Sequence, residues 1–177
     1  MVVRPVVRRD IRGWFAETWK ESRFEWAGLR AAFVQDNASA SRAGTIRGLH
    51  YQAPPAEQIK LVRCTAGIIL DVAVDIRHGS PTFGGWHAEI LSAENHTAVW
   101  IPAGFAHGFC ALTDDARVEY KCSAEYREAL AFGIRWNDPA LGIPWPCSNP
   151  VLSDADARWP LLADAPEHFS MADFVTK

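Results

Sequence analysis

Apolar and polar positions alternate in the middle of the chain. Between residues 70 and 76, every second side chain is apolar: Leu70, Val72, Val74 and Ile76. Asp71 and Asp75 lie between them, so the pattern predicts a β-strand with one apolar face and one solvated face. On that face the two aspartates would be structural. Similar short segments follow at 88–91, 98–101, 108–112 and 117–122.

Turn-forming residues separate these segments, at 78–81, 93–95 and 113–115. Short strands at regular intervals with turns between them predict a β-sandwich or β-barrel. Helical patterns are confined to 16–25 and 163–174, each long enough for a turn or two of helix. The Pro- and Gly-rich stretch 137–150 predicts an ordered loop that wraps around the barrel. The chain is therefore expected to be all-β with short terminal helical segments.

Composition limits the number of domains and the classes of partner. A chain of 177 residues with 49% hydrophobic content can bury one core, so one domain is predicted over residues 1–177. The net charge of -3 provides no basic field, and we expect neither a nucleic-acid partner nor a membrane partner. Without an apolar signal segment near the N-terminus, the chain is predicted to be cytoplasmic.

The four cysteines, Cys64, Cys110, Cys122 and Cys147, form no CxxC pair. A zinc site or a disulfide framework would need closer or more numerous cysteines in a chain of this size. We therefore expect them to be reduced packing residues in the interior.

Two polar motifs carry candidate chemistry. The first, RGLHYQ at 47–52, is followed by Lys60 and Arg63, and its neighbouring strand segments could bring these side chains to one cavity. The second places Pro102, Gly104 and His107 at the Pro-x-Gly-x-x-His spacing of the second cupin motif. This spacing favours a cupin-type jelly-roll β-barrel.

A metal-binding cupin needs two closely spaced histidines and a carboxylate in its first motif. Here His50 is followed by Tyr51 and Gln52, where a second imidazole would have to be. We therefore expect no metal and no other cofactor.

Further blocks at 75–84, 119–126 and 132–145 complete a pattern of long, specific motifs. With the two motifs above, they make the chain resemble the dTDP-4-dehydrorhamnose 3,5-epimerases, from residue 10 to about 164. The resemblance implies a jelly-roll enzyme that inverts C3 and C5 of a nucleotide-linked 4-keto-6-deoxyhexose. Both carbons flank the C4 ketone, so inversion needs a base, an acid on the opposite face and an enolate stabiliser.

The resemblance also implies residue roles. His50 is expected to be the base, Tyr120 the acid that returns a proton, and Lys60 the stabiliser of the enolate oxygen. A late aspartate orients the histidine in this family. Here that residue is expected to be Asp156, with Asp154 as the second candidate.

Substrate binding is expected to involve residues from several segments: Arg12, Phe15, Glu17, Gln35, Asn37, Arg47, His107 and Tyr126. The family forms homodimers in which an N-terminal strand crosses to the neighbouring subunit, so the first three of these residues would serve the partner's site. Trp14, Trp19 and Trp26 cluster nearby and are consistent with a partner surface.

Two departures from the family pattern concern the nucleotide. Ala131 stands where the family often has glutamate, and Ala155 where it often has lysine or arginine. dTDP is the expected carrier, and a related sugar route in antibiotic or polysaccharide synthesis stays open. So do three other functions: a 3- or 5-monoepimerase, a metal-dependent cupin, and a barrel that binds nucleotide sugars without catalysis.

Overall fold

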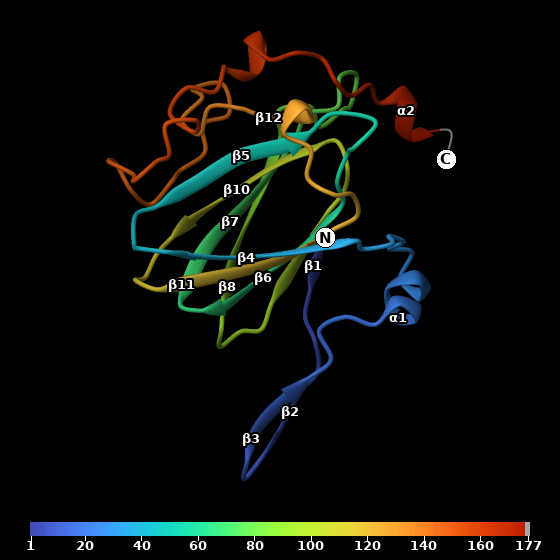
Figure 1. Ribbon diagram of the computed structural model, residues 1–177, viewed down its shortest axis with the longest axis vertical. Coiled ribbons are helices and arrows are strands. Elements are labelled where there is room, and N and C mark those ends of the chain that lie inside the picture. The colour runs from blue at the N-terminus through green and yellow to red at the C-terminus, as the bar shows by residue number, and fades with distance from the viewer. Residues whose placement is uncertain (176–177) are drawn as a thin grey trace.

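A computed structural model of the protein describes residues 1–175 and consists mainly of antiparallel strands. The first sheet has five strands, in the order β1 (Val2–Val3), β9 (Ala98–Ile101), β6 (Lys60–Ala66), β11 (Ala116–Cys122) and β4 (Gln35–Ser41). The second sheet also has five, in the order β12 (Ala131–Gly133), β5 (Ile46–Gln52), β10 (Phe105–Ala111), β7 (Ile68–Asp75) and β8 (Trp86–Ser92). The sheets face each other (Figure 1), which confirms the predicted all-β jelly roll.

The elements predicted from the sequence occur close to their expected positions. Each expected strand lies within or overlaps one of β7 to β11. The terminal helices are short: α1 (Glu21–Trp26), a 3-10 turn at Leu162–Asp164 and α2 (Ala172–Val175). A further 3-10 turn, Glu128–Leu130, precedes β12. The stretch 137–150 contains no helix or strand, as expected of an ordered loop.

Strand β7 is buried on both faces, so the predicted solvated face is wrong. Asp71 and Asp75 are 2% and 1% exposed. Ile69 and Ala73 face the core between the sheets, whereas Val72 and Val74 pack on the outer face of the second sheet. The chain after β12 covers that outer face with residues that include Leu141, Leu162 and Phe169. The chain after β12 thus forms a third layer on the second sheet. This layer excludes water from the face of β7 that carries Val72 and Val74, which is the face that the alternation predicted to be apolar.

The N-terminal hairpin, β2 (Val7–Asp10) and β3 (Gly13–Ala16), projects away from the two sheets (Figure 1). Phe15 and Trp14 on it are 69% and 54% exposed. Trp26 is also exposed, but Trp19 packs against Trp100 on the first sheet. The expectation of an exposed tryptophan cluster therefore holds for Trp14 and Trp26 and is wrong for Trp19.

The cysteines are free. Cys64, Cys110 and Cys122 are buried as expected, but Cys147 is partly exposed because it lies in the loop on the outer face. Over residues 1–175, no helix is long and apolar enough to cross a membrane.

Candidate active site

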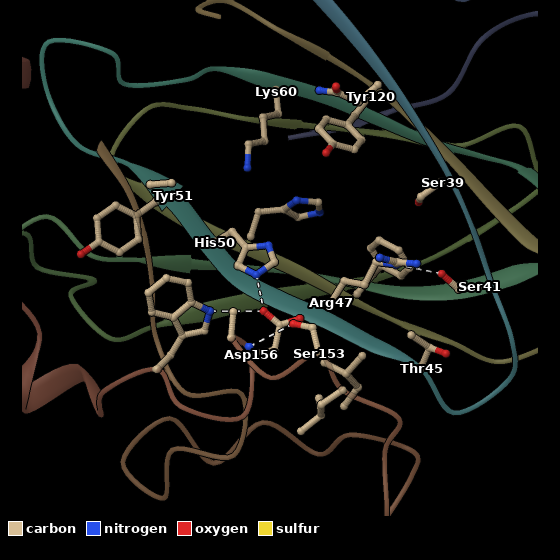
Figure 2. Close-up of a pocket in the computed structure, with 18 of the residues that line it drawn as sticks. Ser39, Ser41, Thr45, Arg47, His50, Tyr51, Lys60, Tyr120, Ser153 and Asp156 are labelled. Atoms are coloured by element: carbon tan, nitrogen blue, oxygen red, sulfur yellow. Dashed lines mark hydrogen bonds and ion pairs between the residues drawn. The ribbon is translucent and has the colours of Figure 1, made fainter. Parts of the chain in front are cut away.

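A cavity of about 780 Å³ opens between the two sheets. It is lined by nine residues that the sequence singled out: Gln35, Asn37, Arg47, His50, Lys60, His107, Tyr120, Tyr126 and Asp156. His50 and Lys60 were expected on neighbouring strands, but β5 and β6 belong to opposite sheets. Their side chains approach from the two walls of the barrel, so the cavity has chemically different sides (Figure 2).

His50 on β5 forms the central contact of the cavity. Its Nε2 lies 2.5 Å from Oδ1 of Asp156, which follows 106 residues later and comes from the chain that covers the second sheet. A carboxylate accepting Nε2–H fixes the tautomer and leaves Nδ1 as the nitrogen that can take a proton. The His50 side chain is 43% exposed and Asp156 only 5%. The structure thus brings together the pair that the resemblance implied, with Asp156 rather than Asp154 as the partner.

Asp156 is held by neighbours that the sequence did not single out. Trp159 Nε1 donates to Asp156 Oδ1 at 3.2 Å, and the backbone N–H of Asp156 donates to Ser153 Oγ at 3.1 Å. Burial acts to raise the pKa of Asp156, but the hydrogen bonds from His50 and its other neighbours outweigh it and lower the pKa. The carboxylate of Asp156 is therefore charged at neutral pH.

Trp159 reaches Asp156 because β12 leaves room for it. A Cβ atom on Gly133 would lie 2.6 Å from the Trp159 ring. Gly133 is the register partner of His50, so the contact between Gly133 and Trp159 lies beside the histidine. The tight packing of a glycine against an indole is a tertiary feature that no local motif signals.

Two further glycines let β5 and β10 approach closely. A Cβ on Gly48 would lie 2.5 Å from Cα of Gly108, and Gly48 has a φ of 144°, a conformation open to glycine alone. The ladder is irregular here, between His107 and Phe109. His107 becomes the register partner of His50. The glycine of the RGLHYQ motif thus sets the position of both histidines.

His107 forms a second imidazole–carboxylate pair. Its Nε2 lies 2.7 Å from Asp71 Oδ2, and the two side chains are 7% and 1% exposed. Asp71 was expected to be a structural residue on a solvated face. It lies in the barrel interior instead and orients a residue of the cavity wall.

Lys60 and Tyr120 point into the cavity from the first sheet, opposite His50 (Figure 2). Lys60 is 7% exposed and its Nζ lies 6.0 Å from the centre of the Tyr120 ring. Within residues 1–175, no hydrogen bond or ion pair of this ammonium group is found. Burial lowers the pKa of Lys60, although Cys122 and Asp71 act in the opposite direction. A buried donor without a partner is suited to an anionic oxygen of a ligand.

Tyr120 retains its proton at neutral pH. Burial and the nearby Cys122 raise the pKa of its phenol, while Arg47 acts in the opposite direction. Arg47 Nε donates to Ser41 Oγ at 3.0 Å, and this contact holds the guanidinium at the cavity wall. A phenol that is neutral at rest can supply a proton to a carbanion.

The predicted nucleotide-binding residues fall into two groups. Gln35 Nε2 donates to Asn37 Oδ1 at 2.9 Å, and Gln35 Oε1 accepts from the backbone N–H of Tyr126 at 2.7 Å. Tyr126 is 59% exposed at the edge of the cavity. Ala131 and Ala155 line the same cavity, so the two departures from the family pattern do fall on its wall.

Arg12, Phe15 and Glu17 form the other group and do not reach this cavity. Arg12 pairs with Asp10 at the tip of the hairpin, and Glu17 pairs with Arg23. The structure of one chain therefore does not bring these three residues to the site.

His50 and His107 are each paired with a carboxylate and not with each other. Over residues 1–175, no group of three or more His, Cys, Asp or Glu side chains is arranged to hold a metal ion. The donor set of this cavity, an imidazole on a carboxylate facing a phenol and an amine, is suited to proton transfer. That the protein works without a metal or cofactor stays a prediction.

Comparisons with known proteins show the family of the chain. Residues 1–164 match the family model described as dTDP-4-dehydrorhamnose 3,5-epimerase. The chain is 49% identical to the dTDP-4-dehydrorhamnose 3,5-epimerase of Shigella flexneri over 166 residues, 93% of this chain and 92% of that protein.

Solved structures extend the agreement to the fold. An epimerase from Legionella pneumophila in complex with dTDP-4-keto-L-rhamnose superposes with a TM-score of 0.91 at 45% identity, covering 96% of this chain and 91% of that one. A 3'-monoepimerase from Streptomyces bikiniensis in complex with dTDP-quinovose gives a TM-score of 0.92 at 39% identity, covering 98% and 90%. The extent of these matches, on top of the paired histidine and the facing phenol, shows that the chain belongs to the dTDP-4-dehydrorhamnose 3,5-epimerase family and is an isomerase.

Proposed function

We propose that the protein converts dTDP-4-dehydro-6-deoxy-D-glucose to dTDP-4-dehydro-L-rhamnose by inverting C3 and C5. The observation that carries this proposal is the opposition of His50–Asp156 on one wall to Tyr120 and Lys60 on the other. The complex of the Legionella relative with dTDP-4-keto-L-rhamnose supports the choice of sugar.

Each inversion is a proton removal followed by a proton return. Nδ1 of His50 takes the hydrogen next to the C4 ketone, and the electron pair of the broken C–H bond forms the enolate. Lys60 Nζ donates to the enolate oxygen, whose negative charge favours the protonated amine. Tyr120 then delivers its phenolic proton to the opposite face of the carbon. The same set acts once at each carbon.

After each inversion His50 carries an extra proton and Tyr120 lacks one. His50 is 43% exposed on its side chain, so solvent can take its proton. Solvent also returns a proton to Tyr120. His50 and Tyr120 are then both ready for the second carbon. The incoming hydrogen therefore originates from solvent, and this makes the reaction visible by isotope exchange.

The nucleotide is expected to lie at the end of the cavity that Tyr126 borders. Gln35 Oε1 positions Tyr126 by accepting a hydrogen bond from the backbone N–H of Tyr126. The exposed Tyr126 ring offers a flat surface for stacking on a base. Asn37, Arg47 and His107 supply polar contacts for the sugar and diphosphate. The Streptomyces bikiniensis relative in complex with dTDP-quinovose supports this carrier. Ala131 and Ala155 reduce the polar contacts available to the nucleotide.

We also propose a homodimer in which the β2–β3 hairpin of each subunit reaches the partner's cavity. The support is the exposure of Phe15 and the finding that, among residues 1–175, those of the hairpin do not line the cavity of their own chain. Arg12, Phe15 and Glu17 would then contact the nucleotide from the other subunit. A cytoplasmic location and one domain over residues 1–177 stay predictions, and residues 176 and 177 lie outside the described part of the chain.

Inversion of only one carbon is the second candidate. The 3'-monoepimerase from Streptomyces bikiniensis resembles this chain with a TM-score of 0.92. A metal-dependent cupin and a non-catalytic barrel are further alternatives, and elemental analysis of the purified protein tests the first of these.

The deciding experiment follows hydrogen exchange with dTDP-4-dehydro-6-deoxy-D-glucose in deuterated water by NMR at C3 and C5. We expect deuterium at both carbons, because both returned protons come from solvent. Deuterium at one carbon identifies a monoepimerase, and none at either carbon refutes the assigned substrate. His50→Ala should abolish exchange at both carbons.

Tyr120→Phe separates the two halves of the reaction. It retains the base and loses the acid, so exchange should persist on the face of His50 while inverted product falls at least about 100-fold.

Exchange that survives in His50→Ala would mean that another group is the base.

A further inference from the structure

Two thiols meet on the outer face of the second sheet, away from the active-site cavity. Phe109 and Ala111 of β10 belong to the core between the sheets, so Cys110 between them points to the opposite face. There its Sγ lies 3.5 Å from Sγ of Cys147, which belongs to the covering loop. Neither cysteine has a role in the epimerase chemistry.

The two thiols differ in their access to solvent. Cys110 is 1% exposed, whereas Cys147 is partly exposed. Burial, and secondarily the adjacent Cys147 thiol, raises the pKa of Cys110 to about 12. An oxidant in solution therefore reaches Cys147 first. Cys110 is placed to react with the oxidised Cys147 and form a disulfide.

The chain around Cys147 is able to move the sulfurs together. A disulfide requires a separation of about 2.05 Å, so the thiols must approach by roughly 1.5 Å. Backbone hydrogen bonds hold Trp145 and Val151, whereas within the described chain none is found for residues 146–150. This short segment can close the gap while β10 stays in place.

We propose that Cys110 and Cys147 form a reversible disulfide that ties the covering loop to β10. With a peroxide as oxidant, the Cys147 thiolate attacks one oxygen and breaks the O–O bond, giving a sulfenic acid and hydroxide. The Cys110 sulfur then attacks the Cys147 sulfur and displaces the hydroxyl group, which leaves as water. The sum is two thiols and one hydrogen peroxide to one disulfide and two waters, and a dithiol reverses it by exchange.

The proposed disulfide lies close in sequence to residues of the cavity wall. Val151 is bonded through its backbone to Gly44 and Ile46, and it lines the cavity with Ser153 and Asp156. The disulfide closes a loop between residues 37 positions apart. Restricting the unfolded chain in this way stabilises the folded protein.

The experiment treats the reduced full-length protein with hydrogen peroxide, removes the oxidant and counts thiols after denaturation. We expect the four thiols of the chain to fall to two and a proteolytic fragment to join the peptides of Cys110 and Cys147. The Tm should rise by about 5 °C, and dithiothreitol should restore all thiols and the original Tm. None of these readouts depends on the substrate or on activity.

Matched variants identify the pair. Cys147→Ser should retain its three thiols and show no rise in Tm, while Cys64→Ala should still lose two thiols. Four thiols remaining in the wild-type protein, or a cross-link between any other cysteines or between chains, overturns the proposal. The peptide map of the wild-type protein decides the outcome even if a variant fails to fold.

Discussion

Asp156 shows how much of a catalytic residue's character comes from its contacts. Its carboxylate is nearly buried, yet His50 and Trp159 both contact one oxygen, and these contacts help to keep its pKa below the ordinary value. Asp154, two positions earlier, is exposed and has no part in the cavity lining. The difference between the two aspartates is one of packing and not of residue type.

Replacing Asp156 by Asn should lower the rate of exchange at both C3 and C5 by about 1000-fold or more, because an amide favours the wrong tautomer of His50. The measurement is the NMR exchange rate at fixed substrate. Asp154→Asn is the matched control and should keep the wild-type rate. Equal losses in the two variants would show that Asp156 does not orient the base.

At the scale of elements, the site depends on the contact between β5 and β10. Gly48 and Gly108 face each other so closely that neither has room for a side chain. The close approach places His107 opposite His50 in the ladder. Two strands that each carry a histidine become one wall of the cavity through their glycines.

Gly48→Ala should therefore lower the free energy of unfolding by about 3 kcal/mol, because a methyl group overlaps backbone atoms and the φ of 144° is strained for alanine. Urea denaturation measures this loss. Gly142→Ala tests positive φ alone, since its φ is 58° and nothing lies within 4 Å of the added methyl group. It should cost about 1 kcal/mol. A similar cost for both variants would mean that β5 and β10 relax apart easily.

For the whole molecule, the β2–β3 hairpin is the feature that points to a second chain. Ile11 and Phe15 are exposed apolar side chains on a two-stranded hairpin that projects from the two sheets. A two-stranded hairpin has little stability alone and gains it by packing against a larger surface. In the proposed homodimer, a second copy of the chain would offer that surface next to the site.

Mixed dimers test this arrangement. Chains with Arg12→Ala and chains with His50→Ala should each be impaired, but refolding them together should restore activity. One cavity of the mixed dimer then combines an intact His50 with an intact Arg12 from the other subunit. No recovery in mixed dimers isolated through a different affinity tag on each variant would place the hairpin in its own subunit's site. A fully active monomer, seen by light scattering, would refute the dimer proposal.

The sequence determined strands β7 to β11 and the all-β class, because period-two patterns are local properties of the chain. Its long motifs, through the family resemblance, also identified His50, Lys60, Tyr120 and Asp156 as candidates. Only the tertiary structure decided that β5 and β6 lie in opposite sheets and that both faces of β7 are buried. It also brought Asp71 to His107 and Trp159 to Asp156. These contacts join residues whose relation depends on how sheets face and how the chain covers them, and alternation within a strand carries no information about either.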